Sequence, residues 1–326
     1  MLTNEVTVAA VLQSAGYATG ALGVWGLGPP HSSGIPPRQG FDEWLGYLSL
    51  DHAEDSYPTQ IWRNADLLML EKNFYSYQGL PATDLITQAA TNFARINKFK
   101  PFFLYLACPP LPRGPEPTPP RRAAALGRLD AEVGKLMAEL RRLNLSNHTA
   151  VIFTSTPVRP PGGGNQSALA NHTGVTARDA GDLSEASLRV PLIAWWPGKI
   201  PSGAVSEQVF AFWDFLPTAA ELAQADAPPH TDGISLAPAL LGRPQTNQHA
   251  FLYWESQGKG GQQAVRWGEW KGIRPGSGAT LQLYNLDSDP GETNNVARRQ
   301  PKIASRIEET LQQARSPFTG GRPKAR

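Results

Sequence analysis

The residues that could carry out chemistry are few and scattered along the chain. None of the six histidines lies four residues from another, so no two share one helical face as a zinc-type motif requires. The densest polar group is segment 51–55 (DHAED), whose carboxylates could converge on a hard cation. A solvated loop in which His52 hydrogen-bonds to the backbone is the favoured interpretation. The chain has no G-x-S-x-G turn, no P-loop and no G-x-G-x-x-G followed by a helix.

Two further patterns each have a functional and a structural interpretation. The glycines of segment 23–28 (GVWGLG) would let backbone amides approach an anion, but their spacing fits neither nucleotide fingerprint and favours a packed turn after a strand. A group of aromatic residues could line a sugar-binding surface by stacking, although most Trp and Tyr side chains are half-buried. These residues are Trp44, Tyr47, Tyr57 and Trp62.

Composition narrows the possible partners. The chain of 326 residues has 30 Lys and Arg against 28 Asp and Glu, and a formal charge of +2 does not indicate a nucleic-acid or membrane surface as partner. No run of about 18 apolar residues predicts a transmembrane helix. The first residues contain Glu5 and no basic region, which argues against a secretory signal, and the compartment stays open. Cys108 is the only cysteine, which excludes an intrachain disulfide.

Hydrophobic periodicity predicts the elements that must position these residues. Apolar residues spaced three and four apart predict helices, and continuous apolar runs predict strands that are covered on both faces. The predicted helices are 83–97, 123–143, 212–223 and 302–314, and the predicted strands are 18–22, 101–107, 149–155, 190–196, 250–254, 263–266, 268–274 and 281–285. Residues 31–81 show little period and are predicted to form long loops or short strands.

The order of these elements predicts the fold class. A strand at 101–107, a helix at 123–143 and a strand at 149–155 follow one another, as in a right-handed parallel crossover. The class is therefore α/β, with a sheet sandwiched by helices. The Pro-rich segment 224–242 indicates a boundary, so we expect an α/β domain over 1–245 and a small antiparallel sheet with one helix over 246–326.

Several segments, taken in order, resemble the sulfatases of the alkaline-phosphatase superfamily, especially arylsulfatase-like enzymes that act on sulfated sugars. They follow the order of the family over nearly the whole chain, which is more specific than any single motif. They include AGYATGALGVWGLG (15–28), QGFDEWLGYLSLDHAEDSYPTQIWRN (39–64), PFFLYLA (101–107), RVPLIAWWPGKIPSG (189–203), WDFLPTAAELA (213–223) and LQLYNLDSDPGETNNVA (281–297). The resemblance implies the sulfatase fold.

The catalytic nucleophile that the resemblance implies is absent from this sequence. In the family it is a formylglycine made within a C-x-P-S-R motif. That motif lies upstream of the first residue of this chain, so we expect an N-terminally truncated member. Cys108 does not replace it, because it precedes Pro109 and lacks the Ser and Arg of the motif.

The calcium ion of the family is held by an Asp pair near the N-terminus and by the Asp and Asn of a T-S-D-N-G turn. At that turn this chain has Thr156 and Pro157 in the ligand positions, and neither can balance a divalent charge. The resemblance therefore predicts that both cofactors, calcium and formylglycine, are lost.

The cationic groups that neutralise the sulfate in the family are replaced as well. The Lys and His of the G-K-W-H-L-G stretch correspond to Val24 and Gly26, and the His that follows the 101–107 strand corresponds to Leu111. The Lys before the E-G-G-x-R-V-P segment aligns with Ala180, or with Arg178 if the loop alignment shifts. We therefore expect no catalytic residue at the aligned positions.

Three functional hypotheses remain. The favoured one is a pseudo-sulfatase without metal or turnover that binds a partner subunit or a sulfated carbohydrate, the latter with His52, Trp62 and Arg63 as candidate contacts. The second is an active arylsulfatase-type hydrolase whose catalytic N-terminal segment is missing from this chain. The third is the non-functional product of a decaying gene. Loss of an upstream strand would also open a sheet edge, through which we expect self-association.

Overall fold

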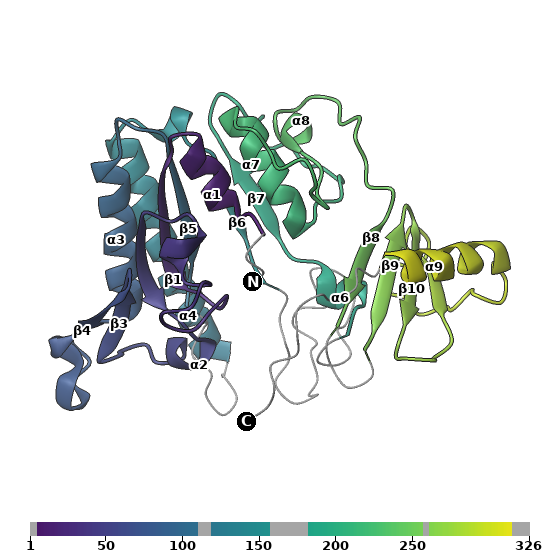
Figure 1. Cartoon of the computed structure of the whole chain (residues 1–326), viewed down its shortest axis with the longest axis horizontal. Coiled ribbons are helices and arrows are strands. Elements are labelled where there is room, and N and C mark those ends of the chain that lie inside the picture. Colours follow the sequence, from purple (N-terminus) through teal and green to yellow (C-terminus); the bar gives the residue numbers. More distant parts are fainter. Residues whose placement is uncertain (1–4, 110–118, 157–181, 257–260, 315–326) are drawn as a thin grey trace. The chain divides into compact units, whose positions relative to one another are not determined.

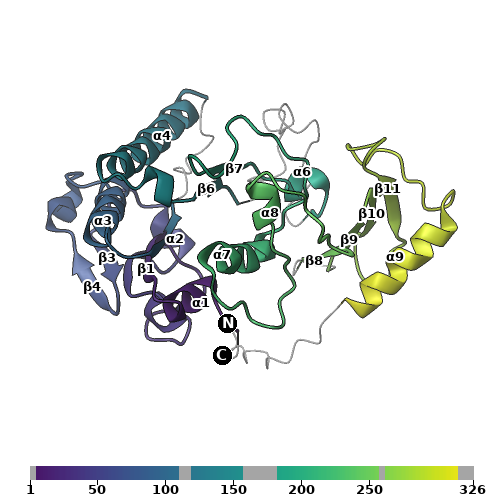
Figure 2. The same ribbon diagram turned by 90° about the horizontal axis from the view of Figure 1, so that it is seen from above.

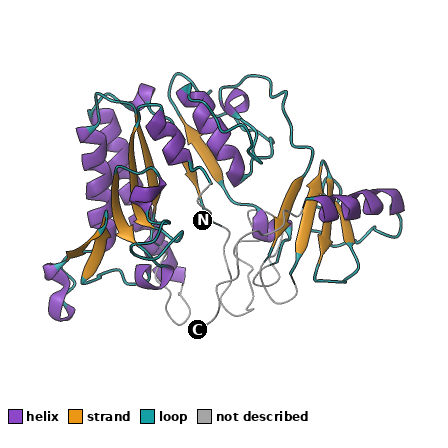
Figure 3. Ribbon diagram, viewed as in Figure 1, coloured by secondary structure: helices purple, strands orange, loops and turns teal. Residues whose placement is uncertain are grey.

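The structure is a computed structural model that describes residues 5–109, 119–156, 182–256 and 261–314. Figure 3 distinguishes its helices from its strands by colour. The chain forms two compact units, the first over Met1–Val151 and Trp195–Asn247 and the second over Ile152–Ala194 and Gln248–Arg326. The second unit thus includes a segment from before residue 245, and the division into domains at that residue stays a prediction.

The first unit is built on a five-stranded mixed sheet with the order β4-β3-β2-β1-β5 (Figure 1). Its strands are β1 Ala18–Val24, β2 Glu43–Tyr47, β3 Gln60–Arg63, β4 Asp66–Met69 and β5 Phe102–Ala107. β1 runs parallel to β2 and to β5, and Leu22 lies opposite Leu45 in one neighbour and Leu106 in the other. β2 pairs antiparallel with β3, and β3 with β4. The predicted strand 101–107 is confirmed, and the region 31–81 supplies β2, β3 and β4.

Helices cover both faces of this sheet (Figure 2). On one face, α3 (Ala82–Ile96) packs Ile86 and Ala90 into a core that includes Leu22, and α4 (Pro119–Arg142) packs on α3. On the other face, α1 (Val8–Ser14) packs beside α7 (Phe215–Ala223), whose Phe215 ring lies 6.2 Å from that of Phe103. The predicted α/β class, with a sheet between helices, is confirmed.

Short helical elements lie between the longer helices and strands along the chain. They are α2 Leu50–Ala53, α6 Glu185–Leu188 and α8 Ala237–Leu240, and the 3-10 helices η1 Pro36–Gln39, η2 Glu71–Ser76, η3 Ser146–His148 and η4 Phe212–Asp214. Two further strands, β6 (Val151–Thr154) and β7 (Leu192–Trp195), pair with each other in a two-stranded sheet. No helix in the described part of the chain is both long and apolar enough to cross a membrane.

The second unit contains an antiparallel sheet with the order β11-β10-β9-β8, which is covered by helix α9 (Pro301–Gln313). Its strands are β8 Leu252–Glu255, β9 Gln263–Trp267, β10 Trp270–Arg274 and β11 Gln282–Asn285. Ile307 and Leu311 of α9 pack on Val265 and Leu283 of the sheet. Gly272 allows this close approach, because a Cβ there would lie 2.5 Å from Ile307 Cγ2. The predicted small sheet with one helix is confirmed.

Three strands expose apolar side chains although their sequences are typical of a sheet interior. Among the described residues, β5 pairs with β1 alone, and β6 and β7 pair only with each other. Tyr105 of β5 is 44% exposed, and Phe153 of β6 and Ile193 of β7 are also exposed. By contrast, β1 is buried from Thr19 to Gly23. β5, β6 and β7 are therefore apolar edge strands that carry none of the charged residues that usually protect such edges.

Candidate functional site

The carboxyl ends of β1, β2 and β5 lie at one edge of the sheet, because these three strands are parallel. Val24 pairs with Tyr47, and Gly23 pairs with Ala107, so the strands end nearly in register. Loops that follow the carboxyl ends of parallel strands form the usual binding sites of open α/β sheets. We therefore take residues 24–34, 48–58 and 107–109 as the candidate site and call it the strand-end site.

The glycine-rich turn after β1 is explained by strand packing. Gly23 has a φ of +105°, and a Cβ there would lie 1.8 Å from the carbonyl oxygen of Ala107. The indole nitrogen of Trp25 donates a hydrogen bond of 2.7 Å to the carbonyl of Gly34, which closes the loop. The structure thus supports the packed-turn interpretation of this segment.

The polar segment 51–55 overlaps a one-turn helix, α2, where the sequence favoured a loop. Ser49 caps this helix, and its hydroxyl accepts a hydrogen bond of 3.2 Å from the His52 backbone N–H. The Tyr47 hydroxyl donates to the Asp55 carbonyl at 2.9 Å, and the His52 ring packs edge-on against Tyr47 with centroids 5.0 Å apart. Burial, and then the charge of Asp55, raise the pKa of Tyr47 far above its usual value, so this donor stays protonated.

Val24 and Gly26, which the resemblance predicts to occupy the positions of two sulfate-binding cations, place no charge in the strand-end site. Val24 is half-buried and packs against the core of the α3 face. Gly26 is exposed, and a Cβ built on it would have no atom within 4 Å. Leu111 and Ala180 lie outside the described residues, so their placement stays a prediction.

The three predicted sugar contacts do not share one face of the sheet. Successive side chains of a strand point to opposite faces, so Trp62 and Arg63 of β3 diverge. Trp62 packs in the core of the α1 face, and its ring lies 6.1 Å from that of His31. Arg63 lies within 3.6 Å of Glu43, and His52 packs against Tyr47, which belongs to the core of the α3 face. Their role in sugar binding stays a prediction.

The described residues do not fit the calcium ion that the family resemblance implies. Within them, no three side chains of His, Cys, Asp or Glu are grouped so as to hold a metal ion. Thr156 is exposed two residues after β6 and supplies only a neutral hydroxyl, whereas calcium prefers several carboxylate and carbonyl oxygens. Pro157 lies outside the described residues.

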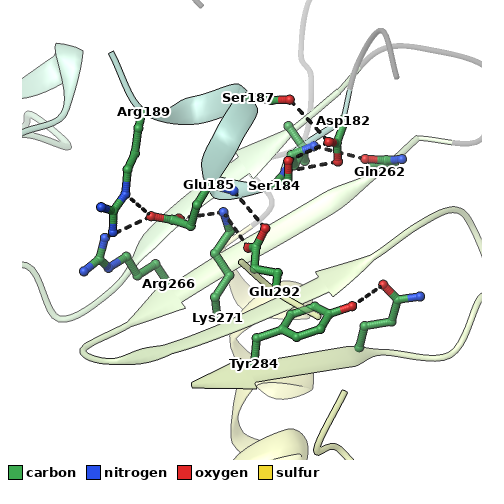
Figure 4. A network of polar contacts seen from close by, with 12 residues as sticks. Asp182, Ser184, Glu185, Ser187, Arg189, Gln262, Arg266, Lys271, Tyr284 and Glu292 are labelled. Carbon is green, nitrogen blue, oxygen red and sulfur yellow. Dashed lines mark hydrogen bonds and ion pairs between the residues drawn. The ribbon is translucent and has the colours of Figure 1, made fainter. Parts of the chain in front are cut away.

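A second group of charged residues is buried in the second unit, and we call it the buried ion network (Figure 4). Lys271 of β10 is 0% exposed, and its Nζ lies 2.7 Å from Glu185 Oε1 and 3.4 Å from Glu292 Oε1. The backbone N–H of Glu185 donates a hydrogen bond of 2.9 Å to Glu292 Oε2. Arg189 and Arg266 contact the other oxygen of Glu185 at 2.7 Å and 3.4 Å. The network therefore joins α6 to the antiparallel sheet.

Burial and charge act in opposite directions on the two glutamates. Burial raises the pKa of Glu185, but Lys271 and the two arginines outweigh it and hold the pKa below its usual value. Burial also raises the pKa of Glu292, and there the opposing effect of Lys271 is insufficient. No spacing pattern in the sequence indicates this network, because Glu185 and Lys271 are 86 residues apart.

A cavity of about 170 Å³ lies beside the buried ion network. Carboxylate, hydroxyl and amide groups line it together with two apolar residues, and no Lys or Arg is among them. The lining residues are Asp182, Ser184, Gln262, Ile273, Pro275, Gln282, Tyr284 and Glu292. A sulfate group would find no neutralising charge there, so we assign the network a structural role.

We predict that Lys271→Met destabilises the protein by about 3–5 kcal/mol at neutral pH, because two buried carboxylates lose their cation. Since Lys271 helps to lower the pKa of Glu185, its stabilising effect is present above the usual glutamate pKa and is lost as the pH falls through the lowered value. The difference in free energy of unfolding between wild type and variant, measured by urea unfolding, should therefore be full at pH 7 and smaller at pH 3, below the usual glutamate pKa.

The matched control is the double variant Lys271→Met/Glu185→Gln, which removes one of the two buried carboxylates that contact Lys271. It should be more stable than Lys271→Met alone. The assigned ion pairing would be contradicted if wild type and Lys271→Met differed by the same free energy of unfolding at both pH values. It would also be contradicted if the double variant were no more stable than Lys271→Met.

Sequence comparisons agree with the geometry of both units. A family model described as "Sulfatase" matches residues 2–109 and 112–225, and one described as "N-sulphoglucosamine sulphohydrolase, C-terminal" matches residues 179–317. The N-acetylgalactosamine-6-O-sulfatase of Bacteroides thetaiotaomicron is 28% identical over 404 residues, covering 96% of this chain and 78% of that protein. Arylsulfatase A of Homo sapiens is 30% identical over 361 residues, covering 90% of this chain and 67% of that protein.

Solved structures show the same fold. The crystal structure of Ps i-CgsB in complex with k-i-k-neocarrahexaose has a TM-score of 0.79 at 24% identity, covering 96% of this chain and 74% of that one. A structure in complex with its substrate D-glucosamine-2-N,6-O-disulfate has a TM-score of 0.71 at 19% identity, with coverage of 96% and 82%. Because the family model covers well over half of the residues and the fold agrees, this chain belongs to the sulfatase family of the alkaline-phosphatase superfamily.

Proposed function

We propose that this chain is a sulfatase-family protein that binds a sulfated carbohydrate without hydrolysing it. The strand-end site carries the proposal, since Val24 and Gly26 stand where the family has two cations. The Val24 side chain packs into the core, and Gly26 has no side chain, so neither places a positive charge beside a sulfate oxygen.

The loss of charge bears directly on the rate of sulfate ester cleavage. Negative charge develops on the sulfate oxygens and the leaving oxygen in the transition state, and removal of one preorganised stabilising group costs on the order of 10²–10³ in rate. Thr156 and Pro157 add to this loss, because a metal ion would otherwise polarise the sulfate.

A saccharide ligand is supported by the solved relatives that hold k-i-k-neocarrahexaose and D-glucosamine-2-N,6-O-disulfate. Within this chain, His52 and Arg63 remain the candidate contacts on the α3 face, and Trp62 remains one on the opposite face. Binding without turnover is compatible with the loss of groups that act chiefly in the transition state.

Two alternatives differ from this proposal in what they require. An active arylsulfatase-type hydrolase would need a segment with C-x-P-S-R and an aspartate pair, and it would also need to work without cations at Val24 and Gly26. The product of a decaying gene would show poor expression and no cooperative melting transition. Both requirements are open to measurement.

We predict no hydrolysis of 4-nitrocatechol sulfate above background by the purified chain, with or without calcium. The decisive experiment adds the upstream segment of a related sulfatase, with its C-x-P-S-R motif converted to formylglycine. This graft alone should stay inactive, because the strand-end site still lacks its cations and a metal site. Addition of Val24→Lys, Gly26→His, Thr156→Asp and Pro157→Asn to the graft should raise the rate by at least about 10².

The control is the same graft with the motif Cys replaced by Ala, which removes the nucleophile and keeps the added strand. Turnover by the graft without the four substitutions would refute the pseudo-sulfatase proposal and support the active-enzyme alternative.

We also propose that the chain self-associates through β5. This strand presents six apolar residues at an edge and pairs with β1 alone among the described strands. Unpaired N–H and C=O groups on a flat apolar edge favour pairing with another chain, and a charge on the strand opposes it.

Tyr105→Lys should therefore reduce association in sedimentation velocity at micromolar concentration. Leu67→Lys is the matched control, because Leu67 is 43% exposed on β4, the opposite edge of the same sheet. It should leave association unchanged. A monodisperse wild-type monomer, or equal effects of the two substitutions, would contradict association through β5.

A further inference from the structure

The segment that follows β4 displays two aromatic side chains to solvent. Tyr75 is 92% exposed and Tyr77 is 71% exposed. Both lie in or directly after η2, at the end of the β3–β4 hairpin below the β4 label in Figure 1. Within the described residues, neither hydroxyl has a hydrogen-bond partner. These rings contribute little to the core, so core packing does not explain why aromatic residues stand at these positions.

The base of this segment is fixed by one buried side chain. Asn73 is buried, and its Nδ2 donates hydrogen bonds to the carbonyls of Pro58 at 2.8 Å and Leu80 at 2.9 Å. Its Oδ1 accepts a hydrogen bond of 2.9 Å from the Leu80 N–H. The Gly79 N–H also donates to the Lys72 carbonyl at 3.2 Å. Residues 70–80 therefore form a clamped loop, and we use that name below.

The backbone of the clamped loop is strained where it presents the first ring. Tyr75 has a φ of +56° and Ser76 a φ of +67°, and such left-handed conformations are disfavoured for residues with a side chain. Strain of this kind persists only where the surrounding structure enforces it, and it is concentrated at functional sites. The hydrogen bonds of Asn73 thus fix the backbone from which Tyr75 projects, and a fixed backbone lowers the entropic cost of binding.

The composition of the tip matches an amphipathic ligand. Tyr75 and Tyr77 are separated by Ser76 and followed by Gln78, so aromatic rings alternate with hydrogen-bonding groups. A pyranose ring has an apolar C–H face and a rim of hydroxyls, which suits this alternation. A protein partner would instead favour a continuous apolar centre.

We propose that the clamped loop is a saccharide-binding platform on which Tyr75 and Tyr77 stack against the sugar rings of an extended oligosaccharide. The proposal rests on the proposed function for its ligand class, but it adds a contact that does not depend on sulfate. Stacking on an exposed ring contributes modestly, so each ring should change the affinity by about 2- to 10-fold.

The experiment uses the full chain and two probes, a chondroitin 6-sulfate hexasaccharide and the unsulfated chondroitin hexasaccharide. Saturation-transfer NMR reports which ligand C–H groups face the protein, and titration gives the affinity. The double variant Tyr75→Ala/Tyr77→Ala should weaken the binding of both probes and abolish saturation transfer to the C–H groups of the sugar rings. Tyr75→Phe/Tyr77→Phe keeps the rings and should bind as wild type does.

The matched control is Phe99→Ala, which removes an aromatic ring that is 88% exposed outside the clamped loop. It should change neither affinity nor transfer. A circular-dichroism melt checks that each variant folds. Asn73→Ala releases the clamp but keeps both rings, and it should also weaken binding.

The outcomes separate this inference from the proposed function. Equal binding of both probes that depends on the tyrosines supports the platform and argues against sulfate recognition. Sulfate-dependent binding that Tyr75→Ala/Tyr77→Ala leaves intact overturns the platform alone. Absence of binding by both probes overturns the platform, and a change of oligomeric state in the tyrosine variant would then assign the loop to a protein contact.

Discussion

The parallel pairing of β1 with β2 and β5 is the interaction on which the first unit depends. β1 is buried on both faces, with Leu22 in the core under α3 and Ala21 in the core on the α1 face. Its carboxyl end passes so close to β5 that only glycine fits at Gly23. This pairing brings together the loops that follow the carboxyl ends of the three strands. It therefore determines where the strand-end site lies, whatever side chains those loops carry.

The loss of a charged side chain has different consequences in the strand-end site and in the buried ion network, because only the second is buried. Gly26 is exposed in open space, so a His can be lost there without an effect on packing. Lys271 is enclosed between Glu185 and Glu292, and its loss would take a cation away from two buried carboxylates. We therefore expect substitutions at Val24 and Gly26 to affect stability less than substitutions in the buried ion network. This asymmetry is the physical basis of our proposal that the chain keeps its scaffold charges and lacks sulfate-binding ones.

Sequence patterns predicted the elements whose signal is local. The helix stripes of α3 and α9 and the apolar run of β5 were predicted to within one or two residues. The sequence did not predict the β3–β4 hairpin as such, because strands of four residues show little hydrophobic period. These strands depend on pairing with β2 and with each other. α2 depends on the Ser49 cap, and the ion network joins distant segments. Trp62 and Arg63 are neighbours in β3 and therefore face opposite sides of the sheet, which could not be inferred while residues 31–81 showed little period.

The central claim is that the strand-end site holds neither the charge nor the metal of an active sulfatase. The most direct test is the melting temperature of the purified chain as a function of calcium concentration, because a ligand stabilises a protein only through a site in its native state. We expect no shift up to millimolar calcium, the same result as with magnesium as a control. An upward shift of several degrees that is specific to calcium would contradict the account and would direct attention to Asp51 and Asp55.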